Sequence, residues 1–303
     1  MDLHEAKSFE GKGHTIPMGR QHLFLWEKAP HAAPLGTILF VHGSSMASTP
    51  GFDLQVPGRP EASPMNWFAS RGFNTWCFDC RGYGRSSKEP DIVATIDEGA
   101  EDAAAASEYI MSRSATGPLL VYGISSGALR AALFTQRHPD RVRRLALDAM
   151  VWTGRGSPTL EQRTKNLAKW RETTRRPIDR AFLNSIYERD LPGTGLDELI
   201  QPFIEQCLEL DSSVPNGTYI DMCVNLPVVD PRSILVPTVI MRGEHDGIAS
   251  LDDLVEFFKL LPNNDKQITV TPGVAHSSFR QKNFLMVYQT LLGFFMRPPK
   301  VYG

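Results

Sequence analysis

Three residues of this chain have the types and the sequence order that catalysis by a serine nucleophile requires. Ser125 lies in Gly123-Ile124-Ser125-Ser126-Gly127, a G-x-S-x-G sequence, and Asp246 and His276 follow it in that order. A serine hydroxyl is a weak nucleophile until a base accepts its proton. Histidine is the usual base, and a carboxylate fixes its tautomer and stabilises the imidazolium. The order serine, acid, histidine is the one expected of this motif, so the predicted chemistry is nucleophilic catalysis by Ser125.

The residues on either side of Ser125 predict a sharp turn between a strand and a helix. The apolar run 118–122 is predicted to be a buried strand, and 128–134 is rich in helix formers. Gly123 and Gly127 leave room for the turn, which lifts the serine hydroxyl clear of the backbone. The hydroxyl then faces a helix N-terminus, where backbone N–H groups can hold a developing oxyanion.

Eight histidines compete for the role of base. His276 is favoured because it lies in a Gly/Pro loop directly after the last predicted strand, and such loops line the ligand crevice of a parallel sheet. His245, next to Asp246, and His42, after an earlier strand, are its rivals. For the acid, Asp246 is favoured over Glu244 because the glycine that follows Asp246 predicts a turn presenting its carboxylate.

The elements that must position these residues alternate along the chain. Apolar runs predict strands at 36–41, 73–78, 118–122, 142–149, 236–241 and 267–270. Helices are predicted between them, at 66–69, 97–113, 128–134, 252–261 and 282–295, and 44–62 is predicted to be loop. This alternation indicates an α/β fold with a mostly parallel, doubly wound sheet, and 22–26 predicts an additional edge hairpin.

The alternation stops after residue 153 and resumes near 233. Helices are predicted at 159–175, 179–190, 196–210 and 218–224, with no strand between them. A helical block inserted into an α/β sheet is typical of a cap, or lid. We therefore predict a core of residues 1–153 and 233–303 and a helical cap of residues 154–232.

Composition excludes several classes of protein. Charged residues make up 22% of the 303 residues and the net charge is −2, which does not favour binding to nucleic acid or to an anionic membrane. The chain begins without the apolar run of a signal peptide and has no apolar stretch of transmembrane length. We expect a cytoplasmic protein with a small-molecule substrate, and both a monomer and a homodimer remain open.

Two of the four cysteines, Cys77 and Cys80, have the C-x-x-C spacing of redox and zinc sites. Both lie on a predicted buried strand, where free cysteine is common and where successive side chains point to opposite faces. Cys207 and Cys223 are distant in sequence. We therefore expect neither a metal nor another cofactor.

Four motifs resemble those of the α/β-hydrolase fold superfamily: His42-Gly43-Ser44-Ser45, Asp79–Ser86, Gly123–Gly127, and Asp246 with His276. The resemblance covers residues 36–153 and 234–295. It implies that one oxyanion N–H comes from Ser44, or from Ser45, and the other from Ser126. Related enzymes that act on haloalkanes or epoxides have aspartate where this chain has Ser125, so serine implies carbonyl chemistry.

The favoured function is that of a serine hydrolase that cleaves a small carboxylic ester through an acyl-enzyme. A C–C bond hydrolase of ring-cleavage dienoates and a lactonase are alternatives, and a ligand receptor that retains the triad is a third. The residues after His276, Ser277-Ser278-Phe279, lack the tryptophan expected of a close relative of the C–C hydrolases. The resemblance therefore favours the ester hydrolase.

The cap is predicted to select the substrate. Residues 155–189 contain nine lysines and arginines but four acids. One of these arginines could hold a substrate carboxylate, although a solvated helix face is the favoured interpretation. The candidate substrate-binding residues are His42, Ser45, Trp152, Arg155, Trp170 and Arg171.

Overall fold

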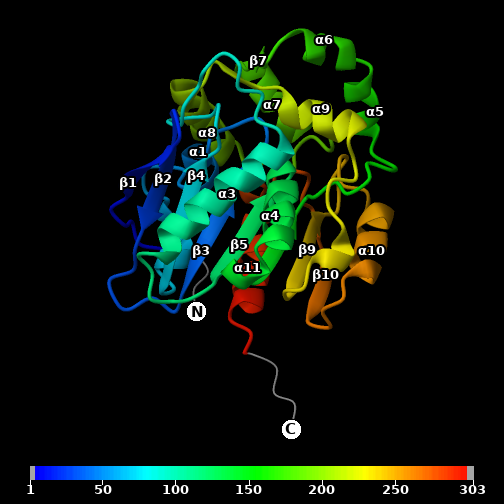
Figure 1. Ribbon diagram of the computed structural model, residues 1–303. Coiled ribbons are helices and arrows are strands. Elements are labelled where there is room, and N and C mark those ends of the chain that lie inside the picture. Colours follow the sequence, from blue (N-terminus) through cyan, green and yellow to red (C-terminus); the bar gives the residue numbers. More distant parts are fainter. Residues whose placement is uncertain (1–3, 299–303) are drawn as a thin grey trace.

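The apolar runs of the sequence pair into one eight-stranded sheet that is parallel except at one edge (Figure 1). The computed structural model describes residues 4–298. The strand order is β1-β2-β4-β3-β5-β6-β9-β10, with β1 antiparallel to β2 and β2 antiparallel to β4. The strands are β1 (Lys12–Met18), β2 (Gln21–Lys28), β3 (Gly36–Val41), β4 (Phe73–Asp79), β5 (Leu119–Ile124), β6 (Val142–Asp148), β9 (Thr238–Gly243) and β10 (Lys266–Thr271).

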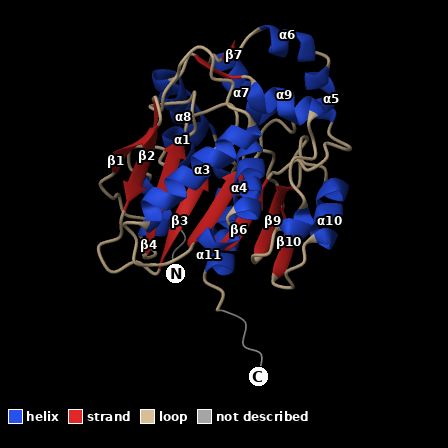
Figure 2. Ribbon diagram, in the orientation of Figure 1, coloured by secondary structure: helices blue, strands red, loops and turns tan. Residues whose placement is uncertain are grey.

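Helices cover both faces of this sheet (Figure 2), which confirms the predicted fold class. Alternate residues of β3 point to opposite faces, so that Leu39 and Val41 join one core cluster and Ile38 and Phe40 join the other. The first cluster packs under α3 (Ile96–Met111), α4 (Ser126–Arg137) and α10 (Leu251–Leu260). The second packs under α1 (Ser48–Phe52), α2 (Pro64–Ala69) and α11 (Phe284–Phe295). The near-continuous apolar sequence of the central strands follows from burial on both faces.

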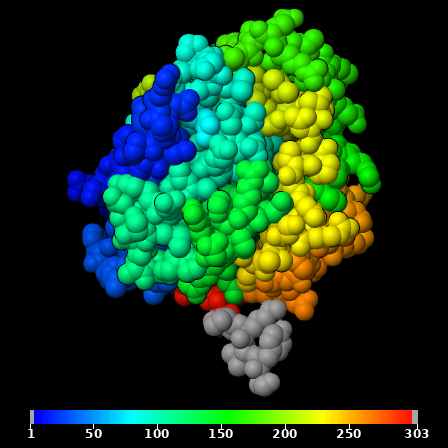
Figure 3. All heavy atoms as spheres, in the orientation of Figure 1, coloured from blue at the N-terminus to red at the C-terminus, as the bar shows by residue number. Residues whose placement is uncertain are grey.

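The segment between β6 and β9 is mainly helical and lies over one end of the sheet, at the top of Figures 1 and 3. We call residues 154–232 the inserted segment. Its elements are α5 (Pro158–Thr164), α6 (Leu167–Glu172), β7 (Arg175–Pro177), α7 (Arg180–Glu188), α8 (Asp197–Leu210), β8 (Ser213–Pro215), α9 (Gly217–Val224) and the 3-10 helix η3 (Pro231–Ser233).

Two sequence predictions for this region were wrong. The helix expected at 159–175 is two short helices, because the backbone leaves the helical conformation at Asn166, between α5 and α6. The region also contains strands, since β7 and β8 form a small antiparallel pair. Three-residue strands are too short for the period-two pattern to be visible in the sequence.

The loop after β3 is more ordered than the sequence predicted. It contains α1 and the 3-10 helix η1 (Pro60–Ala62). Elsewhere in the chain, short 3-10 helices occur at η2 (Pro139–Arg141) and η4 (Ser278–Arg280). The buried Asp79 carboxylate organises this loop, because it accepts hydrogen bonds from the backbone N–H and the hydroxyl of Ser48 at 2.7 and 2.6 Å. Within residues 4–298, no helix has the length and apolar composition needed to cross a bilayer.

Candidate active site

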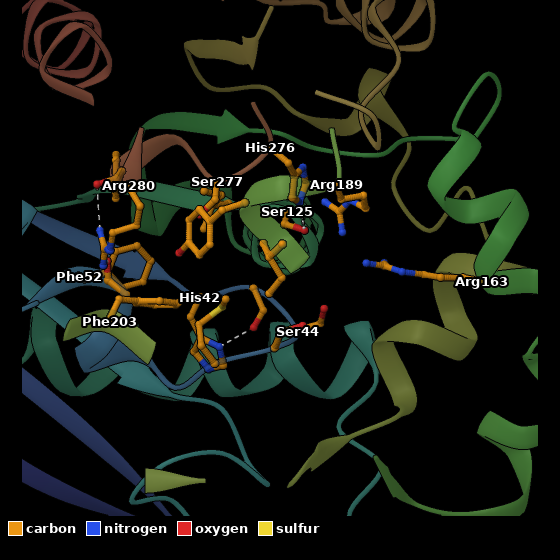
Figure 4. A pocket seen from close by; sticks show the side chains of 18 residues that line it. His42, Ser44, Phe52, Ser125, Arg163, Arg189, Phe203, His276, Ser277 and Arg280 are labelled. Carbon is orange, nitrogen blue, oxygen red and sulfur yellow. Dashed lines mark hydrogen bonds between the residues drawn. The ribbon is translucent and has the colours of Figure 1, made fainter. Parts of the chain in front are cut away.

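A cavity lies where the carboxyl ends of the central parallel strands meet the inserted segment. It contains about 670 Å³ of empty space, part of it open to solvent, and Ser125 and His276 line it (Figure 4). From β3 the chain runs to β4 on one side, and β5 then pairs on the other side of β3. The loops that follow β3 and β5 therefore diverge, and such a switch point is where open α/β sheets bind ligands.

The turn that carries Ser125 lies between a strand and a helix, as the sequence predicted, and its backbone is strained. Ser125 has φ 57° and ψ −126°, directly between β5 and α4. A side chain on Gly127 would lie 2.3 Å from the carbonyl oxygen of Val41, and one on Gly123 would lie 2.4 Å from that of Gly127. Only glycine permits this close approach of helix and strand. This strained backbone conformation places the half-buried Ser125 hydroxyl at the cavity wall.

Ser125, His276 and Asp246 form a hydrogen-bonded chain. His276 Nε2 lies 3.0 Å from Ser125 Oγ, and His276 Nδ1 lies 3.0 and 3.1 Å from the two carboxylate oxygens of Asp246. Burial raises the pKa of Asp246, but the His276 imidazole and the backbone N–H groups of Ala249 and Ile248 outweigh burial and place it below its ordinary value. The carboxylate is therefore ionised and holds a proton on Nδ1, which leaves Nε2 free to accept one.

The loop that presents Asp246 is held by groups that the sequence did not single out. Arg242 donates to the backbone carbonyls of Gly243, Glu244, Asp246 and Ala249, at distances between 2.6 and 2.9 Å. Glycine is required at position 247 by a close contact and not by its backbone conformation. A side chain there would lie 2.6 Å from the carboxylate of Asp190. Asp190 in turn accepts a hydrogen bond from the backbone N–H of His276 at 3.3 Å.

The loop after β3 lies beside the α4 N-terminus, since a side chain on Gly43 would lie 3.5 Å from Ser125 Cβ, and Ser44 and Ser45 are in the cavity wall. Ser126 is the first residue of α4, so its N–H has no partner within the helix. The Ser44 carbonyl accepts from the Tyr83 hydroxyl at 3.1 Å and from Arg176 of β7 at 2.6 Å. These two bonds fix the peptide plane between Ser44 and Ser45, and hence the direction of the Ser45 N–H.

His42 lines the cavity but is not available as a base. Its Nδ1 lies 2.7 Å from the Gly43 carbonyl oxygen, and its Nε2 accepts from the Cys80 N–H at 3.0 Å. Burial, together with the nearby Arg130, lowers the pKa of His42 to about 3, so the ring is neutral and both nitrogens are occupied. His245, the other rival, lies 3.5 Å from Glu244 and does not line the cavity.

A second buried carboxylate, Asp148 at the end of β6, lies behind the nucleophile. Its side chain accepts from the Tyr122 hydroxyl at 2.6 Å, and its backbone carbonyl accepts from the Ser125 N–H at 2.8 Å. Burial raises the pKa of Asp148 to about 6, against an ordinary value of 3.8; the hydroxyls of Tyr122 and Ser278 oppose that shift.

The raised pKa makes stability depend on pH. Between about pH 4 and 6 the Asp148 carboxyl ionises in the unfolded chain but stays protonated in the native protein, so this group lowers the free energy of unfolding as pH rises. Asp148→Asn removes the ionisation and can still accept from Tyr122. We expect its free energy of unfolding, relative to wild type, to rise by roughly 2–3 kcal/mol between pH 4 and pH 7 in urea denaturation. A difference independent of pH would contradict this.

Four of the predicted substrate-binding residues do not line the cavity. Trp152 packs against Phe257 and donates to the Val229 carbonyl at 3.1 Å, and Trp170 packs edge-on against Tyr219. Arg155 and Arg171 are exposed on the surface of the inserted segment. The sequence could not show which way these four side chains point, because their direction depends on how the short helices pack. Of the six candidates, His42 and Ser45 alone are in the cavity wall.

The cavity wall contains three arginines instead, of which Arg280 was not considered from the sequence at all. Arg163 lies on α5, Arg189 directly follows α7, and Arg280 is in η4. The apolar part of the wall comes from both the core and the inserted segment: Met46, Phe52, Ile124, Ile186, Phe203 and Phe279. The basic composition of residues 155–189 was the signal for Arg163 and Arg189, but it could not show which arginines point inward.

The four cysteines are free, and Cys77, Cys80 and Cys207 are buried. Burial raises the pKa of the Cys80 thiol to about 12, which disfavours the thiolate needed for redox or metal chemistry. Across the described part of the chain, no group of three or more His, Cys, Asp or Glu side chains is placed to hold a metal ion.

A family model described as the alpha/beta hydrolase fold matches residues 36–282, and the chain belongs to this family. A comparison with curated proteins finds no match. Among solved structures, the chain is similar to E-2-(acetamidomethylene)succinate hydrolase, with a TM-score of 0.68 and 19% identity over 95% of this chain and 100% of the other.

Two further structures show the same fold at similar distance. For naproxen esterase from Bacillus subtilis the TM-score is 0.65, with 18% identity over 95% of this chain and 92% of that one. For a thermophilic esterase from Thermogutta terrifontis the TM-score is 0.65, with 20% identity over 94% of this chain and 98% of that one. Family membership supports a hydrolase. Sequence identities this low show only that the fold is shared.

Proposed function

We propose that the protein is a serine hydrolase that cleaves small carboxylic esters through Ser125, His276 and Asp246. The observation that carries this proposal is the hydrogen-bonded chain from Ser125 Oγ through His276 to the ionised Asp246, at the wall of a cavity between the sheet and the inserted segment. An activated Ser125 hydroxyl beside backbone N–H groups that can hold an oxyanion suits attack on a carbonyl carbon.

In the first half-reaction His276 Nε2 accepts the proton of Ser125 as Oγ bonds to the ester carbonyl carbon. The oxyanion so formed faces the N–H of Ser126 and an N–H of the loop at Ser44 and Ser45, which stabilise its charge. The intermediate then collapses, the C–O bond to the alcohol breaks, and the imidazolium gives its proton to the departing alkoxide. Water, deprotonated by His276, attacks the acyl-enzyme and releases the acid in the same way.

The inserted segment acts as a lid that selects the substrate. It contributes five residues to the cavity wall: Arg163, Ile186, Tyr187, Arg189 and Phe203. Its Arg176 reaches the Ser44 carbonyl, so the position of the lid and the geometry of the oxyanion loop are linked. A lid of this kind excludes water and completes the pocket when substrate binds.

The base assignment predicts a pH dependence. Activity on a neutral para-nitrophenyl ester should fall as the solution is acidified, because a protonated imidazole cannot accept the Ser125 proton. His276→Ala should abolish this activity and its pH profile, whereas His245→Ala should retain both, since His245 lies outside the cavity. An inactive His245→Ala variant with an active His276→Ala variant would refute the assignment.

A substrate panel separates ester hydrolysis from the other functions considered. The panel contains neutral para-nitrophenyl esters, lactones and a dienoate bearing a vinylogous diketo acid. Turnover of the esters with an initial burst of nitrophenolate indicates the acyl-enzyme. Turnover of the dienoate alone would indicate C–C cleavage, and binding without turnover would indicate a receptor.

A further inference from the structure

The charges at the cavity wall do not balance. Of the 18 residues in the wall, Arg163, Arg189 and Arg280 carry a positive charge, and none is an aspartate or glutamate. Removing a cation from water costs free energy unless the cation is paired with an anion or with hydrogen-bond acceptors. Arginines at a pocket wall therefore need partners, either in the protein or in a ligand.

Arg280 finds its partners in the protein. Its guanidinium donates to the carbonyls of Pro50, Gly51 and Phe279, at 2.5, 2.7 and 3.2 Å, and it lies over the ring of Phe203. Arg176, just behind the wall, is similarly committed to the carbonyls of Pro215 and Ser44. These two arginines are structural.

Arg163 and Arg189 are not committed in this way. Within residues 4–298 no side chain or carbonyl forms a hydrogen bond or ion pair with the Arg163 guanidinium, which is half-buried and lies 4.1 Å from the ring centre of Tyr219. Stacking on a ring fixes the plane of a guanidinium and leaves its N–H donors free. Arg189 binds Asp190 through Nε at 3.0 Å, which leaves both terminal nitrogens free, and 26% of its side-chain surface is exposed.

These two guanidinium groups lie on the same side of the nucleophile. In Figure 4 Arg163 and Arg189 point toward the space beside Ser125 and Ser44, and Phe52 and Phe203 lie on the opposite side. Burial lowers the pKa of Arg163, the adjacent Tyr219 raises it, and the charges of Arg189 and Arg176 lower it further. The same arginines outweigh the effect of burial on Tyr219 and lower its pKa to about 8.

We propose that Arg163 and Arg189 form a carboxylate-binding subsite, and that the substrate is an ester with a free carboxylate on one side of the scissile bond and an apolar group on the other. Planar guanidinium groups with free N–H donors match the two oxygens of a carboxylate. The inference rests on the proposed ester hydrolysis and specifies its substrate class.

The first test compares two matched pairs of esters. In one pair the carboxylate is in the acyl half: para-nitrophenyl hydrogen adipate against para-nitrophenyl hexanoate. In the other it is in the alcohol half: the acetate ester of omega-hydroxyhexanoate against that of hexanol. With Arg163→Gln we expect kcat/KM for the anionic member of at least one pair to fall about ten- to a hundredfold, and that for the neutral member to stay within about twofold.

Matched controls separate the subsite from general effects of charge and folding. Arg171→Gln makes the same charge change on an exposed part of the inserted segment and should leave both members of each pair unchanged. Arg163→Lys should restore part of the loss, since it restores charge without the planar fork. Arg189→Gln should lower kcat/KM for the anionic member as Arg163→Gln does, and its neutral member is not held to the same limit, because Arg189 also pairs with Asp190 beside His276.

A binding measurement distinguishes the subsite from the proposed reaction. Adipate should inhibit hydrolysis of the neutral ester competitively. Calorimetric titration of the Ser125→Ala variant with adipate should show binding, and its Kd should rise at least tenfold in the double variant that also carries Arg163→Gln. If no ester is turned over but adipate still binds in this way, the proposed ester hydrolysis is refuted and the carboxylate-binding subsite is supported. If neutral esters are turned over while Arg163→Gln alters neither the anionic substrates nor adipate binding, the subsite is refuted.

Discussion

Replacing Ser125 with alanine is expected to lower kcat for ester hydrolysis about 10⁶-fold, the loss observed when a serine triad loses its nucleophile. The expectation follows from position: Ser125 Oγ is 3.0 Å from His276 Nε2 and lies at the cavity wall. Alanine keeps the Cβ at the strained φ of 57°, so it changes the chemistry without relieving the turn. The measurement is single-turnover and steady-state release of nitrophenolate.

Two controls make the Ser125→Ala result decisive. Thermal unfolding should change little, since the hydroxyl is half-buried and its one hydrogen-bond partner among residues 4–298, His276, remains held by Asp246. The burst of nitrophenolate should vanish together with steady turnover, because both require the acyl-enzyme. Retention of more than a few per cent of wild-type activity by a folded, uncontaminated variant would show that another group is the nucleophile.

The sequence predicted the sheet well because the physical signals of its strands are local. Each central strand is buried on both faces, so it is a continuous apolar run that no surface helix resembles, and the runs at 36–41 and 73–78 matched β3 and β4 to within one residue. The turn at Ser125 was predictable for a similar reason. Its glycines are required by contacts made within a few residues and against the adjacent strand β3.

The inserted segment was predicted less well because its packing is not local. Its short helices and the strand pair β7–β8 are defined by contacts with one another and with the helices α1 and α3. Whether an arginine on such an element faces the cavity or the solvent changes with a rotation of a few tens of degrees. Composition thus indicated that residues 155–189 were basic, and the structure was needed to separate Arg163 and Arg189 from Arg155 and Arg171.

Asp246→Asn is expected to lower kcat by roughly 10⁴-fold through the wrong histidine tautomer. The Asp246 Oδ1 atom accepts from the N–H groups of Ile248 and Ala249 at 2.8 and 3.0 Å, so the oxygen of an asparagine would stay there. Its NH₂ group would then face His276 Nδ1 and donate to it, and the ring proton would move to Nε2. A protonated Nε2 cannot accept the proton of Ser125.

The matched control for this prediction is Glu244→Gln, two residues away in the same loop. Glu244 accepts from the Gly273 N–H at 2.9 Å, a bond that a glutamine oxygen can keep, and its side chain is half exposed. We expect its kcat to stay within about threefold of wild type, since it orients no group at the cavity. Steady-state kinetics of the two variants on one neutral ester decide between the carboxylates. A large loss in Glu244→Gln with little loss in Asp246→Asn would mean that the hydrogen bonds to His276 Nδ1 do not set its tautomer and that Glu244 is the acid.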